Sequence, residues 1–170
     1  QMKKLVATAA VLGLVGVASA DFSGFYAPDQ WSFYADDDGY VQTGNAPAQI
    51  ELFGTNSGTW YSYTTLTIMT PAAGSFDFDW NYGSFDSPGY DEIGYIVNGT
   101  YYFLDDGFGP GTGSVSVAVN AGDTIGWYVE SYDGCCGESY IEVYNFSAPI
   151  PAPGALALLG LAGLASRRRR

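Results

Sequence analysis

A strict alternation of apolar and polar side chains constrains the fold more than any other feature of this sequence. The alternation is clearest over residues 76–82, 115–119 and 125–129, where every second residue is aromatic or branched aliphatic. Successive side chains of a β-strand point to opposite faces, so a period of two predicts strands with one buried face. Two sheets that each have one buried face pack together as a sandwich.

Turn-forming residues separate further strand-like runs. The pattern predicts strands over residues 31–34, 49–53, 61–69, 75–82, 92–97, 100–104, 114–119, 124–132 and 140–146. Asn98-Gly99 is typical of a type I′ hairpin turn, because both residues tolerate positive φ angles. No segment between these strands has sustained helical spacing. The fold class predicted for residues 21–147 is therefore all-β, an antiparallel, jelly-roll-like β-sandwich.

The first twenty residues predict export. Lys3 and Lys4 precede an apolar run over residues 5–17, and Ala18-Ser19-Ala20 follows it. A basic start, an apolar helix and a small-residue cleavage site are typical of a signal peptide, here residues 1–20, which signal peptidase removes. The mature domain would then begin at Asp21, outside the cytoplasm and in an oxidising compartment.

Residues 148–170 predict a second targeting segment. Pro151-Ala152-Pro153 leads into an apolar run over residues 154–165, and the basic cluster Arg167, Arg168, Arg169 and Arg170 follows Ser166. A helix over those twelve apolar residues would be about 18 Å long, whereas the hydrocarbon core of a bilayer is about 30 Å thick. A span this short suits a temporary anchor better than a permanent one.

The order of these three parts resembles the PEP-CTERM sorting signal of bacterial surface proteins, with Ala152 where that family usually has Glu. The resemblance implies transient anchoring in the inner membrane by a hydrophobic helix, followed by processing by an exosortase. An ordinary C-terminal membrane anchor is the alternative. Residues 74–147 are loosely similar to the sandwich modules found ahead of such tails, and to CUB and MAM domains, a likeness that implies no catalytic site.

Charge is divided sharply along the chain. All six Lys and Arg residues lie in the two targeting segments, whereas residues 21–149 contain all 18 acidic residues and no His, a side-chain charge of −18. Binding of DNA or RNA is excluded as a function, because it depends on basic groups that neutralise phosphates. Catalysis by Ser-His-Asp, Cys-His or Schiff-base chemistry is excluded as well. We expect a domain that is not an enzyme, with a carboxylate-pair glycosidase as a distant alternative.

Acidic loops are candidates for calcium binding, because Ca²⁺ takes six to eight oxygen ligands. Asp86, Asp91 and Asp133 are the residues that we expect to bind Ca²⁺ as a cofactor. None of the acidic loops has the spacing of an EF-hand. The alternative is that these residues are solvated turn aspartates, since Asp favours turns.

Two adjacent pairs of residues are further candidates. Trp60 and Tyr61 cannot both point inward from a strand. They are candidates for stacking on sugar rings, unless they pack across strands against other aromatic side chains. Cys135 and Cys136 lie in a Gly-rich loop. They could form a vicinal disulfide that stiffens the loop, form disulfides between molecules, or stay reduced.

Together these features predict an exported protein of the cell envelope, cell surface or extracellular matrix. Its β-sandwich would act as a non-enzymatic structural or adhesive module. The alternative is a carbohydrate-binding module, with or without Ca²⁺, that acts on extracellular polysaccharide.

Overall fold

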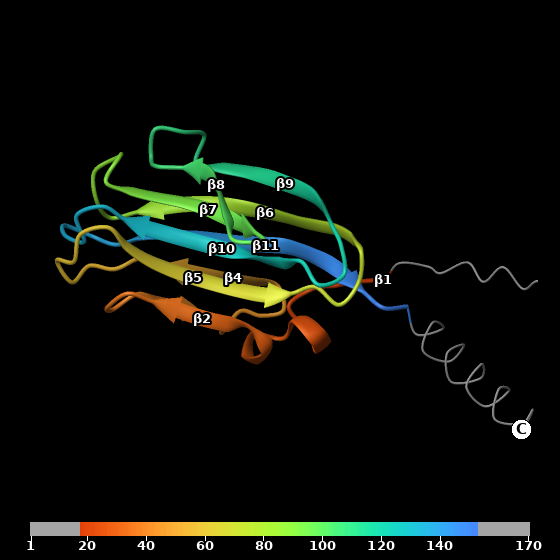
Figure 1. Cartoon of the computed structure of the whole chain (residues 1–170). Helices are drawn as coiled ribbons and strands as arrows, with labels where there is room; N and C mark the ends of the chain where they lie inside the picture. Colours follow the sequence, from red (N-terminus) through yellow and green to blue (C-terminus); the bar gives the residue numbers. More distant parts are fainter. Residues whose placement is uncertain (1–17, 153–170) are drawn as a thin grey trace, which may run out of the picture. The chain divides into compact units, whose positions relative to one another are not determined.

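The computed structural model describes residues 18–152, which fold into two antiparallel β-sheets (Figure 1). Two short 3₁₀ helices, η1 (Gly24–Tyr26) and η2 (Pro28–Gln30), precede most of the strands. The strands are β1 (Ala18–Ala20), β2 (Ser32–Ala35), β3 (Tyr40–Gln42), β4 (Gln49–Phe53), β5 (Ser62–Met69), β6 (Gly74–Ser84), β7 (Asp91–Val97), β8 (Thr100–Asp105), β9 (Thr112–Val119), β10 (Thr124–Ser131) and β11 (Ser139–Ile150).

The two sheets are built from strands that alternate along the chain. One sheet has the order β3-β4-β11-β6-β9, with β1 added on β11, and the other has the order β2-β5-β10-β7-β8. Strands β4 to β11 are therefore divided as 4-11-6-9 and 5-10-7-8, which is the strand order of a jelly roll. The prediction of an all-β antiparallel sandwich is confirmed.

The core lies between the two sheets and is rich in aromatic rings. Phe76, Phe78 and Trp80 of β6 face Trp127 of β10, and the Phe76 and Phe78 ring centroids are each 5.5 Å from that of Trp127. These residues occupy the alternating positions that predicted the strands. Burial of large aromatic side chains contributes most of the stabilisation of such a core.

All nine predicted strands are present, and the differences lie at short elements and strand ends. Strands β1 and β3 have three residues each, too few to show an alternation. Trp31 precedes β2 instead of beginning it, because it is the residue that caps the end of η2; its buried indole N–H donates to the carbonyl oxygen of Tyr26.

The strand pairing extends past the two expected domain boundaries. Ala18–Ala20, the expected signal-peptidase site, pairs with residues 148–150 of β11, and the Tyr26 hydroxyl donates to the Pro149 carbonyl oxygen at 2.8 Å. Cleavage after Ala20 would therefore remove β1 and expose the backbone of this end of β11.

The remaining targeting residues lie outside the described part of the chain. The expected signal helix falls on residues 1–17, and the expected C-terminal helix, Pro153 and the four arginines fall on residues 153–170. Pro151 and Ala152 follow β11 without regular structure. Within residues 18–152, no helix is long and apolar enough to span a membrane.

Candidate functional site

The outer face of the five-stranded sheet brings aromatic and acidic side chains together. Along β5, β7 and β10, one set of alternating residues faces the core, and the other set carries tyrosines and glutamates outward. We call this surface the tyrosine–glutamate face; it consists of Tyr63, Glu92, Tyr101, Tyr128, Glu130 and Tyr132. None of these six residues is among the site residues predicted from the sequence.

Two carboxylates lie at the centre of this face. Glu92 of β7 and Glu130 of β10 are directly opposite each other in the strand register, where two like charges repel. Tyrosine hydroxyls hold Glu92 in place: Tyr128 donates to Oε1 at 2.8 Å, and Tyr132 donates to Oε2 at 2.6 Å. Glu92 is therefore a fixed hydrogen-bond acceptor, and Glu130 lies directly beside it.

Burial and charge shift the titration of these groups. Partial burial raises the pKa of Glu130, the neighbouring Tyr63 hydroxyl lowers it, and the charge of Glu92 raises it again. Burial also raises the pKa of Tyr128 and of Tyr132, and hydrogen bonds to the Glu92 carboxylate raise both further. The tyrosines consequently stay protonated and act as hydrogen-bond donors.

A glycine makes room for the ring at the base of this face. The buried Tyr128 ring covers Gly94 of β7, where a Cβ atom would lie 2.2 Å from the ring and 2.2 Å from the Tyr102 carbonyl oxygen. Tyr101 packs edge-on against Tyr128 at a centroid distance of 4.9 Å and is 49% exposed. The outermost ring thus rests on a rigid support and presents a free surface to solvent.

Exposed rings continue from this face to the end of the sandwich. Trp60 and Tyr61 precede β5, are 69% and 67% exposed, and have ring centroids 6.5 Å apart. The Tyr61 ring lies 6.0 Å from that of Tyr132, whose hydroxyl binds Glu92. We call Trp60, Tyr61 and Tyr132 the aromatic band; it joins the predicted stacking residues to the paired carboxylates.

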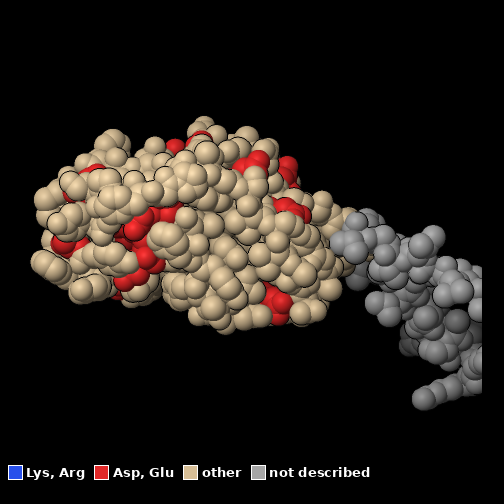
Figure 2. All heavy atoms as spheres, turned by 90° about the horizontal axis from the view of Figure 1, so that it is seen from above, with Lys and Arg blue, Asp and Glu red and all other residues tan. Residues whose placement is uncertain are grey.

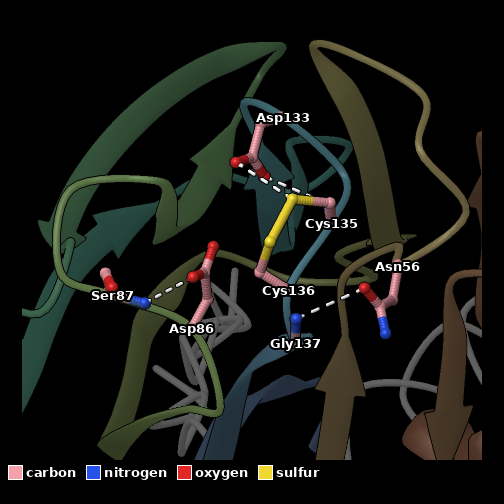
Figure 3. Close-up of a disulfide and its surroundings, with 7 residues drawn as sticks. All are labelled: Asn56, Asp86, Ser87, Asp133, Cys135, Cys136 and Gly137. Atoms are coloured by element: carbon pink, nitrogen blue, oxygen red, sulfur yellow. Dashed lines mark hydrogen bonds between the residues drawn. A yellow bond between two sulfur atoms is a disulfide. The ribbon is translucent and has the colours of Figure 1, made fainter.

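A disulfide turn supports the loop that carries this band (Figure 3). Cys135 and Cys136 are bonded to each other, and the Cys135 N–H donates to the Asp133 carboxylate at 3.0 Å. The Gly137 N–H donates to the side-chain oxygen of Asn56 at 3.3 Å, which ties the turn to the β4–β5 loop. The disulfide belongs to the scaffold of the candidate site and not to its chemistry.

The three aspartates expected to bind calcium lie in different settings. Asp91 is the first residue of β7 and is buried, Asp86 lies in the β6–β7 loop, and Asp133 accepts the Cys135 N–H in the disulfide turn. Burial is the main cause that raises the pKa of Asp91 to about 6; the charges of Asp86 and Asp133 act in the same direction, and the hydroxyls of Ser131 and Ser139 act against it. Within residues 18–152, no three carboxylate, thiol or imidazole groups are arranged to hold a metal ion.

No known protein-family model and no curated protein matches this sequence. Among solved structures, the chain is similar to the family 11 carbohydrate-binding module of the cellulosomal cellulase Lic26A-Cel5E of Clostridium thermocellum. That match has 13% identity, covers 82% of this chain and 97% of the module, and has a TM-score of 0.42. A family 35 carbohydrate-binding module from an environmental isolate matches at 16% identity, with 84% and 96% coverage and a TM-score of 0.39.

A third match is TmCBM61 in complex with β-1,4-galactotriose, at 12% identity over 78% of this chain and 97% of that one, with a TM-score of 0.39. At TM-scores this low, the likeness assigns neither a fold family nor a ligand to this chain. What this chain binds therefore has to be inferred from its own surface residues.

Proposed function

We propose that the described domain is a non-catalytic module that binds a neutral polysaccharide through the tyrosine–glutamate face and the aromatic band. The observation that carries this proposal is that exposed aromatic rings lie next to a pair of carboxylates, one of which is held by two tyrosine hydroxyls. Trp60, Tyr61 and Tyr101 are large and exposed, and Glu92 and Glu130 lie opposite each other beside them.

Each part of this surface matches a part of a sugar. A pyranose ring has an apolar C–H face that packs on Tyr or Trp, which supply large rigid contact area at little entropic cost. Its hydroxyl groups donate to ionised carboxylates in charge-assisted hydrogen bonds, which are stronger than neutral ones. Apolar rings around a few placed polar groups are the usual composition of a binding site.

The charge of the domain favours a neutral polymer. Acidic side chains are spread over the surface in Figure 2, and residues 18–152 contain no Lys, Arg or His. Anionic polysaccharides, nucleic acids and anionic membranes are repelled by such a surface. A neutral extracellular polysaccharide is not repelled, and its hydroxyl groups can use the carboxylates as acceptors.

The setting of the module in this proposal is an exported surface protein. Signal peptidase would act on the N-terminal segment and an exosortase on the PEP-CTERM-like tail, so that the module is displayed at the cell surface or in the extracellular matrix. Support for this setting comes from the sequence of the two targeting segments. N-terminal sequencing of the exported protein tests it: the expected first residue is Asp21.

Affinity electrophoresis of the full chain through gels that contain neutral glucan, xylan, mannan or galactan tests the binding proposal. We expect retardation by at least one polymer, with Trp60→Ala, Tyr61→Ala and Tyr101→Ala each losing about 1–2 kcal/mol of binding energy, or roughly five- to thirtyfold in affinity. Phe25→Ala is the matched control, because Phe25 is an exposed ring in η1, outside the aromatic band.

If Phe25→Ala weakens the retardation as much as Tyr61→Ala does, the polysaccharide does not bind specifically at the aromatic band. If none of the polymers retards the wild-type chain, the carbohydrate-binding proposal is wrong. The sandwich would then be a structural or adhesive module.

A further inference from the structure

Two buried aspartates of this domain differ in how many hydrogen bonds their carboxylates accept from the protein. The carboxylate of Asp105 accepts hydrogen bonds from the backbone N–H groups of Gly107, Gly109 and Gly111 at 2.8, 3.1 and 2.8 Å. Asp91 is only 1% exposed, yet no donor among the described residues reaches its Oδ2 atom. The contrast matters because an unsatisfied buried carboxylate is costly, whereas a satisfied one is not.

The unsatisfied oxygens around Asp91 form a group. Six buried side-chain atoms of the described residues lack a hydrogen-bond partner, and four of them are Asp86 Oδ2, Asp91 Oδ2, Ser131 Oγ and Ser139 Oγ. Both serines are 0% exposed. Four unpaired buried oxygens at one place are together able to bind an ion, which four separate unpaired groups are not.

Strand register places these four residues together. Ser131 is directly opposite Asp91 in the β10–β7 pairing, on the side of the strands that faces the core. Ser139 is directly opposite Ser84 in the β11–β6 pairing, and a Cβ atom at Gly54 would lie 2.6 Å from Ser131 Oγ and 3.6 Å from the Ser139 carbonyl oxygen. Ser84 connects Asp86 to the same end of β6, since its hydroxyl accepts from the Asp86 N–H at 3.0 Å.

The chemistry of the missing ligand follows from this set. All four unpaired atoms around Asp91 are oxygens, and two of them belong to carboxylates. Residues 18–152 contain no basic side chain that could neutralise these two charges. An oxygen-only set with two negative charges is the environment that Ca²⁺ prefers, with backbone carbonyls or water completing six to eight ligands.

We propose that Asp86, Asp91, Ser131 and Ser139 bind a calcium ion inside this end of the sandwich. The ion would neutralise both carboxylates and join the β6–β7 loop, β7, β10 and β11. Asp133 is not among its ligands, because neither of its carboxylate oxygens is among the unpaired buried atoms and one of them accepts the Cys135 N–H in the neighbouring disulfide turn (Figure 3). The proposal goes beyond polysaccharide binding and does not depend on it.

Thermal unfolding and calorimetric titration of the full chain, freed of metal by a chelator, test this site. Calcium at a hundredfold excess over its Kd should raise the Tm of the wild-type protein by about 5–10 °C. Magnesium at matched ionic strength should give a much smaller shift, since Mg²⁺ demands a tighter octahedral geometry. No shift and no heat with calcium, or an equal shift with magnesium, would show that the proposal is wrong.

Asp91→Asn and Asp77→Asn form a matched pair of variants. Asp77 lies on the outer face of the other sheet and accepts hydrogen bonds from serines, so its variant should keep the full calcium shift. Asp91→Asn should lose the shift and, in chelator, unfold at a higher temperature than the wild type, because the buried charge is gone. If both variants respond to calcium equally, the ion binds elsewhere.

Ser131→Ala is a second test of the calcium site, for the case that Asp91→Asn does not fold. It removes one proposed ligand without changing charge, and we expect at least a tenfold weaker calcium affinity with little change of Tm in chelator. An unchanged calcium affinity would remove Ser131 from the site and overturn the proposed ligand set. Affinity electrophoresis of the wild-type chain in chelator tests polysaccharide binding without calcium. A failure of the calcium proposal can therefore be told apart from a failure of the carbohydrate-binding proposal.

Discussion

The two outer faces of the sandwich carry the same charge but use it differently. On the outer face of the sheet β3-β4-β11-β6-β9, small polar side chains satisfy the carboxylates: Ser114 and Asn145 donate to Asp79 at 2.5 and 2.7 Å, and Asn81 donates to Glu142 at 2.6 Å. On the tyrosine–glutamate face, the donors are tyrosine hydroxyls set among aromatic rings.

This difference shows that the number of acidic residues does not define a binding surface. On the first face, serine and asparagine side chains donate to Asp79 and Glu142, and the hydroxyls of Tyr140 and Tyr144 donate to no carboxylate among the described residues. Tyrosine donors place carboxylates beside exposed apolar area, which is the combination that a sugar can use. Each prediction below changes one face and leaves the other as its reference.

The largest expected effect comes from the glycines beneath an aromatic ring on each face. Gly94→Ala puts a Cβ atom against a buried ring and a backbone carbonyl, so we expect a loss of about 3 kcal/mol in the free energy of unfolding. Gly83→Ala meets only the partly exposed Tyr140 ring, which can move, and should cost about 1 kcal/mol. Urea denaturation measures both; equal losses would show that Tyr128 is not rigidly held.

A smaller effect is expected from removal of one hydroxyl group. Tyr128→Phe leaves Glu92 without one of its two donors in a partly buried position, and we expect a loss of about 1–2 kcal/mol in stability. Tyr144→Phe, on the outer face of the other sheet, is the control and should change stability little. If Tyr128→Phe leaves the free energy of unfolding unchanged, water replaces the lost donor and the carboxylate pair is more exposed than the structure indicates.

The fold could be predicted from the sequence because its signal is local. Alternation within 76–82 or 115–119 needs only neighbouring residues, so the sandwich and all nine expected strands follow from it. Strand β1 could not be found in this way, because Ala-Ser-Ala carries no alternation and pairs with residues about 130 positions away.

The candidate site was only partly predictable for the same reason. Trp60 and Tyr61 stand out as neighbours in the sequence, and both are exposed. Glu92 and Glu130 meet only through the register of β7 and β10, which no local pattern determines. The sequence does place Glu92 and Glu130 on the outward-facing positions of their strands. With 18 acidic residues in the chain, however, many other pairs could be chosen in the same way.

The third effect concerns charge repulsion on the tyrosine–glutamate face. Burial raises the pKa of Glu130 in the folded state and the charge of Glu92 adds to the shift, so folding disfavours the ionised form. This penalty is absent below the ordinary pKa of 4.5 and develops as pH rises through the raised value. Glu130→Gln should therefore stabilise the protein at neutral pH and have little effect at acid pH, as followed by Tm in chelator. Stabilisation that is the same at both pH values would contradict this origin.

The smallest effect should come from Asp79 on the opposite outer face, and its sign should be reversed. Hydrogen bonds from Asn145 and Ser114 lower the pKa of Asp79, so the folded state favours the ionised form. The stabilisation is fully present above the ordinary pKa of 3.8 and is lost as pH falls through the lowered value. Asp79→Asn should slightly lower the Tm at neutral pH, with the difference from the wild type vanishing in acid.

Paired with Glu130→Gln, this variant tests the contrast between the two faces directly. Two removals of one negative charge from a strongly acidic domain would shift the Tm in the same direction if overall repulsion dominated. Opposite shifts require that local donors and burial decide what each carboxylate contributes. Asp79→Asn should also leave polysaccharide binding unchanged, because Asp79 lies on β6 of the other sheet, away from the tyrosine–glutamate face and the aromatic band.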